Sequence, residues 1–257
     1  MGTCWISGDT HSDVRRLSAD SFYEQKEFTV QEDNYVIICG DFGLVWDRNG
    51  ESGREKHWLD WLENKKFTTL FVPGNHENYD RLDDYPEEEW HGGKVHKIRP
   101  HVIELLRGEV YEILGKKFFA FGGASSHDIQ DGILDYEDAK WKEKAKKLKA
   151  QKKYMYRVKG LSWWEQELPS GEEMDNGIRN LEANDWTVDF IITHSPSTIE
   201  QTLLDETKIC ESDILTDYLD RIKTRTEYRW HFFGHMHLDK AINDKDICLY
   251  EQIIRII

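Results

Sequence analysis

Short polar clusters directly follow apolar runs at five places in this 257-residue chain. The clusters lie at residues 8–11, 40–41, 74–77, 193–196 and 234–237. The apolar runs before them are short and continuous, which is typical of strands in a sheet that is covered on both faces. Because ligands collect outside the carboxyl ends of strands in such sheets, the pattern predicts that residues from the whole length of the chain meet at one site.

Strands and helices alternate in the first third of the chain. Apolar runs at residues 3–7, 35–39 and 68–72 predict strands, and helical spacing at residues 12–28 and 50–66 predicts helix between them. This order implies parallel strand pairing with right-handed crossovers. Four segments separated by Gly- or Pro-containing turns then predict antiparallel hairpins, at residues 95–98, 102–106, 109–114 and 117–121. Further strands are predicted at residues 188–193, 228–233 and 248–256, and further helices at residues 198–204 and 212–223.

Residues 127–186 are predicted to form an insertion rich in helix, within a single domain that spans residues 1–257. Two stretches of it, starting at Ser162 and Ser170, match the capping box that begins a helix. The pattern as a whole indicates an α/β sandwich with mixed sheets, in two or four layers.

Charge and cysteine content limit the partners and the compartment. The formal net charge of −15 disfavours broad binding to nucleic acid or to acidic membranes, although bound cations would still admit a phosphate substrate. Four scattered cysteines, without a C-x-x-C pair, indicate reduced thiols in a reducing compartment, so a cytoplasmic location is predicted. Neither a signal peptide nor an apolar run of about 20 residues is found, which predicts no membrane span.

The clusters contain carboxylate, amide and imidazole donors, which are the groups that divalent metals bind. Asp9 and His11 alternate along the chain, so both side chains can face one ion; the alternative is a helix cap followed by a surface histidine. Asp41 could bridge two cations through its two oxygens, or could be another loop carboxylate. Asn75 offers a neutral oxygen, and His76 could act as an acid near neutral pH or simply be a polar turn residue.

The two later clusters are less specific by themselves. His194 ends a buried strand and could be a core histidine whose ring bonds to the backbone. His235 and His237 form an H-x-H pair that could address one metal or two neighbouring metals.

The clusters, in this order, resemble the calcineurin-like metallophosphoesterase superfamily, whose pattern is D-x-H, G-D, G-N-H-E/D, a later His and G-H-x-H. The match runs from Asp9 to His237 and implies a four-layer α/β/β/α sandwich with two mixed sheets. Residues 122–126 and 162–169 also resemble bacterial members whose substrates are generally unassigned.

The resemblance implies a role for each matching residue. Asp9, His11 and His237 would hold one metal, Asn75, His194 and His235 a second, and Asp41 would bridge the two. His76 would lie beside the metals and stabilise or protonate the leaving oxygen. Two divalent ions of Mn, Fe, Zn, Co or Ni would serve, with manganese expected in vitro, and a metal-bridging hydroxide would attack phosphorus in line.

One stretch departs from the pattern of many relatives, G-D-x-x-D-R-G. Leu44 stands where the Asp that orients His76 is expected, and Val45 stands where the Arg is expected. The departure argues against protein phosphatases and dinucleoside-polyphosphate hydrolases. It leaves open whether Asp47 or another group supports His76.

The predicted function is therefore hydrolysis of phosphate esters by a phosphodiesterase or phosphatase, on a small molecule rather than nucleic acid. The alternatives are a nuclease acting on single strands and, in a different class, a non-catalytic metal-binding scaffold for a partner protein. Residues 140–153 carry eight Lys and one Glu, which is typical of a solvated helix face but could also be a docking patch or lid for a phosphate-rich substrate. Arg157, His127 and Asp128 are further substrate-side candidates, since the insertion could overhang the metals.

Overall fold

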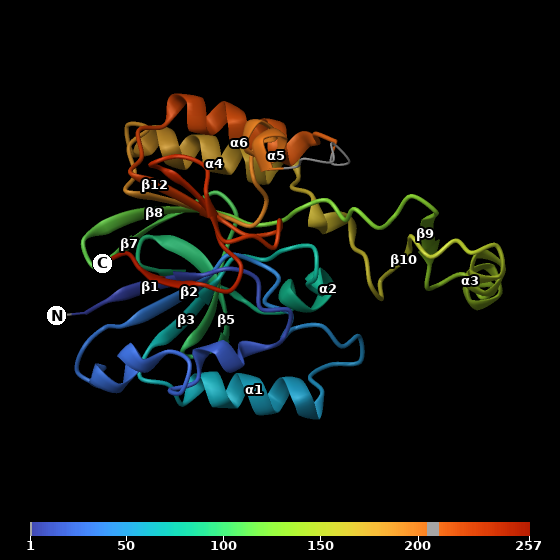
Figure 1. Cartoon of the computed structure of the whole chain (residues 1–257), viewed down its shortest axis with the longest axis horizontal. Helices are drawn as coiled ribbons and strands as arrows, with labels where there is room; N and C mark the ends of the chain where they lie inside the picture. The colour runs from blue at the N-terminus through green and yellow to red at the C-terminus, as the bar shows by residue number, and fades with distance from the viewer. Residues whose placement is uncertain (1, 205–210) are drawn as a thin grey trace.

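The computed structural model describes residues 2–204 and 211–257. Two large β-sheets stack face to face, and helices cover both outer faces, so the body has four layers (Figure 1). This arrangement confirms the predicted α/β sandwich with two mixed sheets. Cys210 lies outside the described residues, whereas Cys4, Cys39 and Cys248 are buried and free.

The first sheet holds the strands of residues 4–105 and one strand near the C-terminus. Its strand order is β15-β1-β2-β3-β6-β5-β4, with the bounds β1 (Cys4–Ser7), β2 (Tyr35–Ile38), β3 (Thr68–Phe71), β4 (Glu87–Trp90), β5 (Gly93–Arg99), β6 (Val102–Leu105) and β15 (Ile253–Arg255). Strands β1, β2 and β3 run parallel, as the alternating sequence predicts, and β5 and β6 form a predicted hairpin. Strand β6 also pairs in parallel with β3, which was not predicted. The edge strand β4 has three successive Glu residues and was not predicted, because its exposed side chains carry no apolar alternation.

All strands of the second sheet lie between residues 109 and 248. Its order is β13-β14-β12-β11-β8-β7, with the bounds β7 (Glu109–Ile113), β8 (Lys116–Phe121), β11 (Phe190–Thr193), β12 (Trp230–Phe233), β13 (Lys240–Ala241) and β14 (Asp246–Cys248). Strands β8, β11, β12 and β14 run parallel. The five strands that precede the predicted clusters are β1, β2, β3, β11 and β12, and all of them lie in parallel ladders.

Helices form the outer layers. The helix α1 (Gly53–Glu63) lies on the first sheet, and α4 (Gly171–Ala183), α5 (Thr198–Leu204) and α6 (Ile214–Arg225) lie on the second (Figure 1). The remaining short helices are α2 (Tyr79–Leu82), η1 (Val14–Leu17), η2 (Tyr23–Glu27) and η3 (Glu165–Glu167). No helix in the described ranges is long and apolar enough to span a bilayer.

Three buried apolar clusters hold the layers together. The central one joins side chains of both sheets, including Ile37 and Leu70 from the first and Phe118, Phe190 and Phe232 from the second. A second cluster fills the space under α1, and a third fills the space under α4 and α6. At about 25 cal/mol per Å² of apolar surface removed from water, these clusters supply the main stabilisation of the stacked sheets.

Local predictions fail at two places. Residues 12–28, predicted as helix, form the two short 3₁₀ helices η1 and η2, because their apolar side chains Val14, Leu17 and Phe22 bury in the core under separate turns. The capping box at Ser162 is wrong, since the Ser162 hydroxyl accepts from the backbone N–H of Val158 instead. The capping box at Ser170 is present and begins α4.

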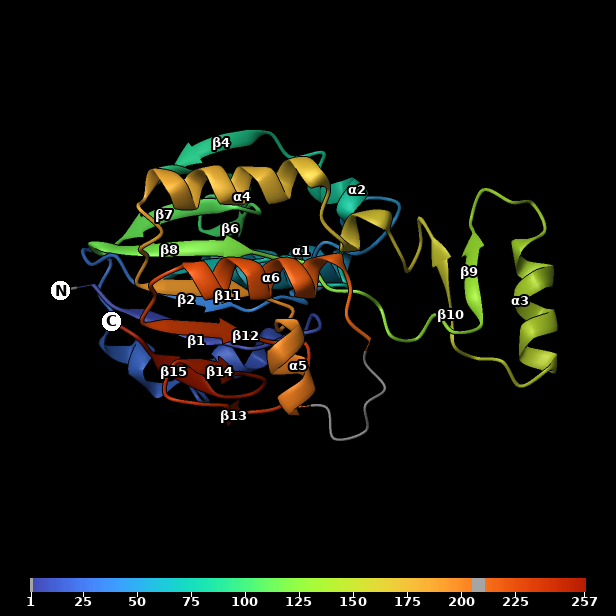
Figure 2. The same cartoon turned by 90° about the horizontal axis from the view of Figure 1, so that it is seen from above.

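An arm projects from the body between β8 and η3 (Figure 2). It consists of β9 (Gly132–Asp135), α3 (Trp141–Ala150) and β10 (Tyr156–Lys159), with β9 and β10 paired in parallel. Arg48 anchors the arm to the body, because its guanidinium lies over the Tyr136 ring and pairs with Glu137. Helix α4, which also falls within residues 127–186, contacts β7 of the body rather than the arm.

Candidate metal centre

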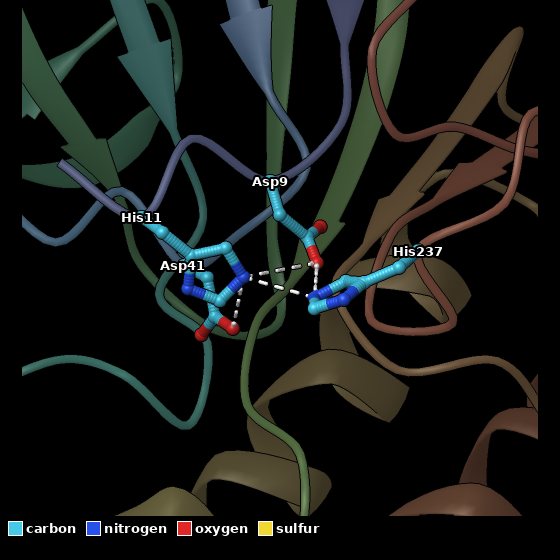
Figure 3. Close-up of side chains that lie close together, drawn as sticks. All are labelled: Asp9, His11, Asp41 and His237. Atoms are coloured by element: carbon cyan, nitrogen blue, oxygen red, sulfur yellow. Dashed lines mark hydrogen bonds and ion pairs between the residues drawn. The ribbon is translucent and has the colours of Figure 1, made fainter. Parts of the chain in front are cut away.

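The five polar clusters converge at the carboxyl ends of β1, β2 and β3 in the first sheet and of β11 and β12 in the second. Figure 3 shows Asp9, His11, Asp41 and His237, whose side chains point toward one another from the loops that follow β1, β2 and β12. Ligand atoms of these four residues all lie within 4.8 Å of one another.

This first group joins two buried carboxylates to two accessible imidazoles. Asp9 and Asp41 are 0% and 2% exposed, whereas the His11 and His237 side chains are 31% and 49% exposed. The His237 Nε2 atom lies 3.3 Å from Asp9 Oδ2 and 2.9 Å from His11 Nε2, which in turn lies 3.7 Å from Asp41 Oδ2. Buried carboxylates that face imidazole nitrogens, with no Lys or Arg in this group, are a donor set suited to a divalent cation.

A second group lies on the other side of Asp41. The His194 Nδ1–H donates to the backbone oxygen of Cys39 at 2.8 Å, and in that tautomer of the neutral ring Nε2 is an acceptor. That Nε2 faces Asn75 Oδ1 at 3.3 Å and Asp41 Oδ1 at 3.4 Å. The Asn75 amide nitrogen donates to Ser126 Oγ at 3.5 Å, so its oxygen is turned toward His194. Histidines that bind metals commonly donate the N–H of their other ring nitrogen to a backbone carbonyl, which fixes the orientation of the ring.

Asp41 lies between the two groups and presents one oxygen to each. Its Oδ2 faces His11, and its Oδ1 faces His194 and accepts the backbone N–H of His76 at 2.8 Å. Burial acts to raise the pKa of Asp41, but His194, His76 and His11 outweigh it and hold the pKa below its usual value. The carboxylate is therefore ionised at neutral pH and is placed to contact ions on both sides.

His235 also reaches this centre. Its ring centroid lies 5.0 Å from that of His194. Its Nε2 lies 2.7 Å from the Nε2 of His127, a residue that sequence motifs did not place in the metal set. A signal for His127 exists, since it follows the carboxyl end of β8, the parallel strand beside β11.

The backbone of the centre is strained. Four of the seven predicted ligands have positive φ, namely His11 (44°), Asp41 (43°), His235 (64°) and His237 (50°). A non-glycine residue rarely adopts this left-handed region, and the strain persists only where the surrounding structure imposes it. Such outliers concentrate at functional sites.

Glycines in three of the clusters permit the close approach of these side chains. A Cβ atom at Gly40 would overlap the His194 ring, and one at Gly74 would overlap the Asp41 carboxylate. A Cβ atom at Gly234 would overlap the Asp9 carboxylate. The glycines therefore belong to the site through packing, beyond their effect on the turns.

His76 lies at the edge of the centre. Its ring centroid is 5.0 Å from that of His11, and it stacks on Trp46 at 6.1 Å. Burial lowers the pKa of His76 to about 4, although Asp41 acts to raise it, so the ring is neutral at pH 7. Its Nε2 accepts a hydrogen bond from Nη2 of Arg157 at 3.0 Å.

The support for His76, which the sequence left open, thus comes from the arm. Arg157 lies on β10, and no feature of the sequence placed its side chain beside His76. Asp47 has other partners, because its N–H donates to Glu55 and its carbonyl accepts from Arg81. Leu44 is fully buried in the apolar cluster under α1.

A further group of metal-type side chains consists of Glu200 from α5, His231 from β12 and Asp246 from β14. The ammonium of Lys223 pairs with Glu200 and lies 3.1 Å from Asp246, so a cation of the chain already fills this group. His231 has no motif context in the sequence. Its Nδ1 lies 2.9 Å from Glu200 Oε1, and its Nε2 lies 2.8 Å from Thr193 Oγ1, so the ring links these two side chains by hydrogen bonds. We interpret this group as a structural ion-pair network.

Replacing Gly74 by Ala tests whether the close approach of the Gly74 backbone to the Asp41 carboxylate is needed. The new methyl group would push Asp41 out of place, so we expect a loss of about 1–3 kcal/mol in the free energy of unfolding and a lower metal content after purification. Denaturant unfolding and elemental analysis measure the two quantities. Gly171→Ala is the matched control, since nothing lies within 4 Å of a Cβ atom there. Equal metal content in both variants would contradict the packing role.

Comparison with known proteins gives one result. The family model for calcineurin-like phosphoesterases matches residues 2–239, which is nearly the whole chain and includes all five clusters. No curated protein matches. The match covers most strands of both sheets and all seven predicted ligands, so this chain belongs to the calcineurin-like phosphoesterase family.

Proposed function

We propose that this protein hydrolyses phosphate esters with the help of two divalent cations. Asp9, His11 and His237 would hold one cation, and Asn75, His194 and His235 the other. Asp41 would bridge the pair. Two such cations supply a nucleophile at neutral pH and neutralise the charge of the phosphoryl group.

The observation that carries this proposal is the position of Asp41. Its two oxygens face different groups of donors, one built around His11 and the other around His194. A single-metal site would need only one of these groups. The two groups offer oxygen and nitrogen donors, which suit ions such as Mn, Fe, Zn, Co or Ni, and we expect manganese to serve in vitro.

The residues of the chain also favour a small substrate. A cavity of about 630 Å³ opens beside His11 and is lined by polar groups that include Arg15, Arg16 and Tyr250. This volume lies in the usual range for small-molecule sites. His76, at the edge of the centre, would stabilise the leaving oxygen through the one N–H that its neutral ring keeps, since its Nε2 already accepts from Arg157. Both sheets contribute ligands, so we propose that residues 1–257 work as one catalytic domain, and the free, buried thiols suit a cytoplasmic location.

The projecting arm favours a second candidate, a nuclease acting on single strands. Helix α3 buries Ala145 against β9 and leaves its five lysines exposed, at positions 142, 144, 146, 147 and 149. Tyr154 beside it is 65% exposed and could stack on a base. The strong negative charge of the whole chain weighs against this candidate.

Metal analysis of the purified protein, joined to a panel of substrates, tests the function. The panel contains phosphomonoesters, phosphodiesters, cyclic nucleotides and single-stranded nucleic acid, each assayed with added manganese. We expect about two metal ions per chain and turnover of at least one phosphate ester. A protein that carries two metals and turns over nothing would instead support the non-catalytic scaffold.

Asp41→Asn removes the bridging charge while keeping the size of the side chain. We expect turnover to fall to the level of the metal-free protein and the number of bound metals to drop, because a neutral amide cannot bridge two cations as a carboxylate does. Asp47→Asn is the matched control, since Asp47 follows the same strand but has no part in the centre. Full activity of Asp41→Asn would rule out the bridging role.

His76→Ala separates metal binding from the later steps of the reaction. We expect normal metal content, with turnover slowed by ~10²-fold or more for esters with poor leaving groups, because positioned acids contribute on that order. Esters with good leaving groups should be affected less. If every ester in the panel were hydrolysed at the normal rate, His76 would have no role in departure of the leaving group.

Neutralising the five lysines of α3 to Gln tests the nuclease candidate. If the arm guides a strand to the centre, KM for single-stranded nucleic acid should rise by ~10-fold or more, because lost phosphate contacts weaken binding, while KM for a small ester stays unchanged. The control variant neutralises five lysines of the body, including Lys26 and Lys66, so that both variants carry the same net charge. An unchanged KM for nucleic acid would reject the docking role of the arm.

A further inference from the structure

Arg157 is the side chain through which the arm reaches the candidate metal centre. It lies on β10, yet only 8% of its side chain is exposed. Its Nη2 donates to His76 Nε2 at 3.0 Å, and its Nη1 donates to the backbone oxygen of Asn75 at 3.1 Å. The guanidinium therefore contacts two successive residues of one polar cluster, far from Arg157 in the sequence.

Two further contacts fix the guanidinium. Nη1 also donates to the Ser162 backbone oxygen at 3.2 Å, and Nε donates to Asp128 Oδ1 at 2.5 Å. A guanidinium has five N–H groups in a planar fork. Among the described residues, these four contacts leave the second N–H of Nη2, beside His76, for another acceptor.

The charge of Arg157 is incompletely balanced by the chain. Asp128 pairs with it but is 49% exposed, so water screens that pair. Glu167 lies 3.8 Å away, but burial raises the pKa of Glu167 to about 8, so this carboxyl is mostly protonated at neutral pH. A buried cation is costly unless it is paired. The cations proposed for the same centre would add to the repulsion, and an anion placed between them would remove it.

We propose that Arg157 binds the phosphoryl group of the substrate, with the free N–H of Nη2 donating to a non-bridging phosphoryl oxygen beside His76. This role rests on the phosphoesterase function proposed above and deepens it. Guanidinium–phosphate contacts are short, charge-assisted and directional, so one such contact both strengthens binding and fixes the orientation of the phosphoryl group. The arm thereby becomes part of the substrate site.

A purely structural role for Arg157 makes different predictions. If the guanidinium only ties the arm to the body, removing Asp128 would loosen this tie and would weaken or leave unchanged the binding of a phosphate. If the guanidinium binds phosphate, Asp128 competes with the ligand for the same positive charge. Removing that carboxylate should then tighten phosphate binding.

Binding of inorganic phosphate to the manganese-loaded protein measures this without turnover. Isothermal titration calorimetry compares the wild type with Arg157→Gln, Asp128→Asn and Arg48→Gln. We expect Arg157→Gln to bind phosphate ~10-fold or more weakly, as loss of a charge-assisted hydrogen bond implies, and Asp128→Asn to bind it ~3–10-fold more tightly. Arg48→Gln is the matched control, since it loosens the anchor of the arm but keeps Arg157, and its affinity should stay within about twofold of the wild type.

Thermal melting and manganese content show whether each variant is folded and loaded. Arg157→Lys, which keeps the charge but loses the planar fork, should bind phosphate with intermediate affinity. Wild-type affinity in a folded Arg157→Gln would overturn the proposal. If Arg157→Gln does not fold, Asp128→Asn decides by itself. Asp128 is half-exposed, so this variant should fold, and phosphate binding equal to or weaker than that of the wild type would also overturn the proposal.

The same measurements separate this proposal from the function on which it rests. A wild type that hydrolyses no ester of the panel would contradict the phosphoesterase function, whereas the calorimetry still reports on Arg157. A wild type that hydrolyses an ester, with phosphate affinity unaltered by both Arg157→Gln and Asp128→Asn, would contradict the role of Arg157 alone. Steady-state kinetics on that ester should show the loss in Arg157→Gln chiefly as a higher KM.

Discussion

The apolar interface between the two sheets determines where the predicted ligands lie. Ile37 and Leu70 from one sheet and Phe190 and Phe232 from the other bury together in a single cluster. Hydrophobic burial is not directional, but a packed interface of interlocking side chains fixes the relative position of the strands. Because parallel strands from both sheets end at one edge of this interface, the loops that follow them meet there. A slip of one residue in any of these strands would turn its side chains to the opposite face.

The stability of the interface supports a centre that is itself unfavourable. Two carboxylates are almost fully buried, and four of the seven predicted ligands adopt left-handed backbone angles. Burial and strain of this kind each cost free energy, and they persist because the sheets hold the loop ends in place. Cations bound between Asp9, Asp41 and the imidazoles would return part of that cost. The fold thus positions the donors, and the glycines at positions 40, 74 and 234 give them room.

The arm gives this family member a feature that its metal motifs do not describe. Residues between β8 and η3 leave the body, form a small sheet with a lysine-rich helix, and return Arg157 to the edge of the centre. Leu44 is buried in the core, and the ring of His76 is held by a guanidinium instead of a carboxylate. A cation at this place changes the electrostatics of the site, because it favours an anionic ligand where a carboxylate would repel it.

Much of the fold and most of the candidate site could be predicted from the sequence, since both depend on local patterns. Continuous apolar runs specified the parallel strands, and the polar residues after them, from Asp9 to His237, specified which side chains would meet. Weakly patterned segments could not be predicted in the same way: β4 has three exposed Glu residues, and residues 12–28 pack as two short turns rather than one helix. The sequence by itself determined the donor types and their order along the chain. Only the tertiary structure decided that Asp41 faces both donor groups, that His127 lies against His235, and that Arg157 contacts His76. These residues are brought together by the stacking of the sheets and the return of the arm, and no local sequence pattern encodes such distances.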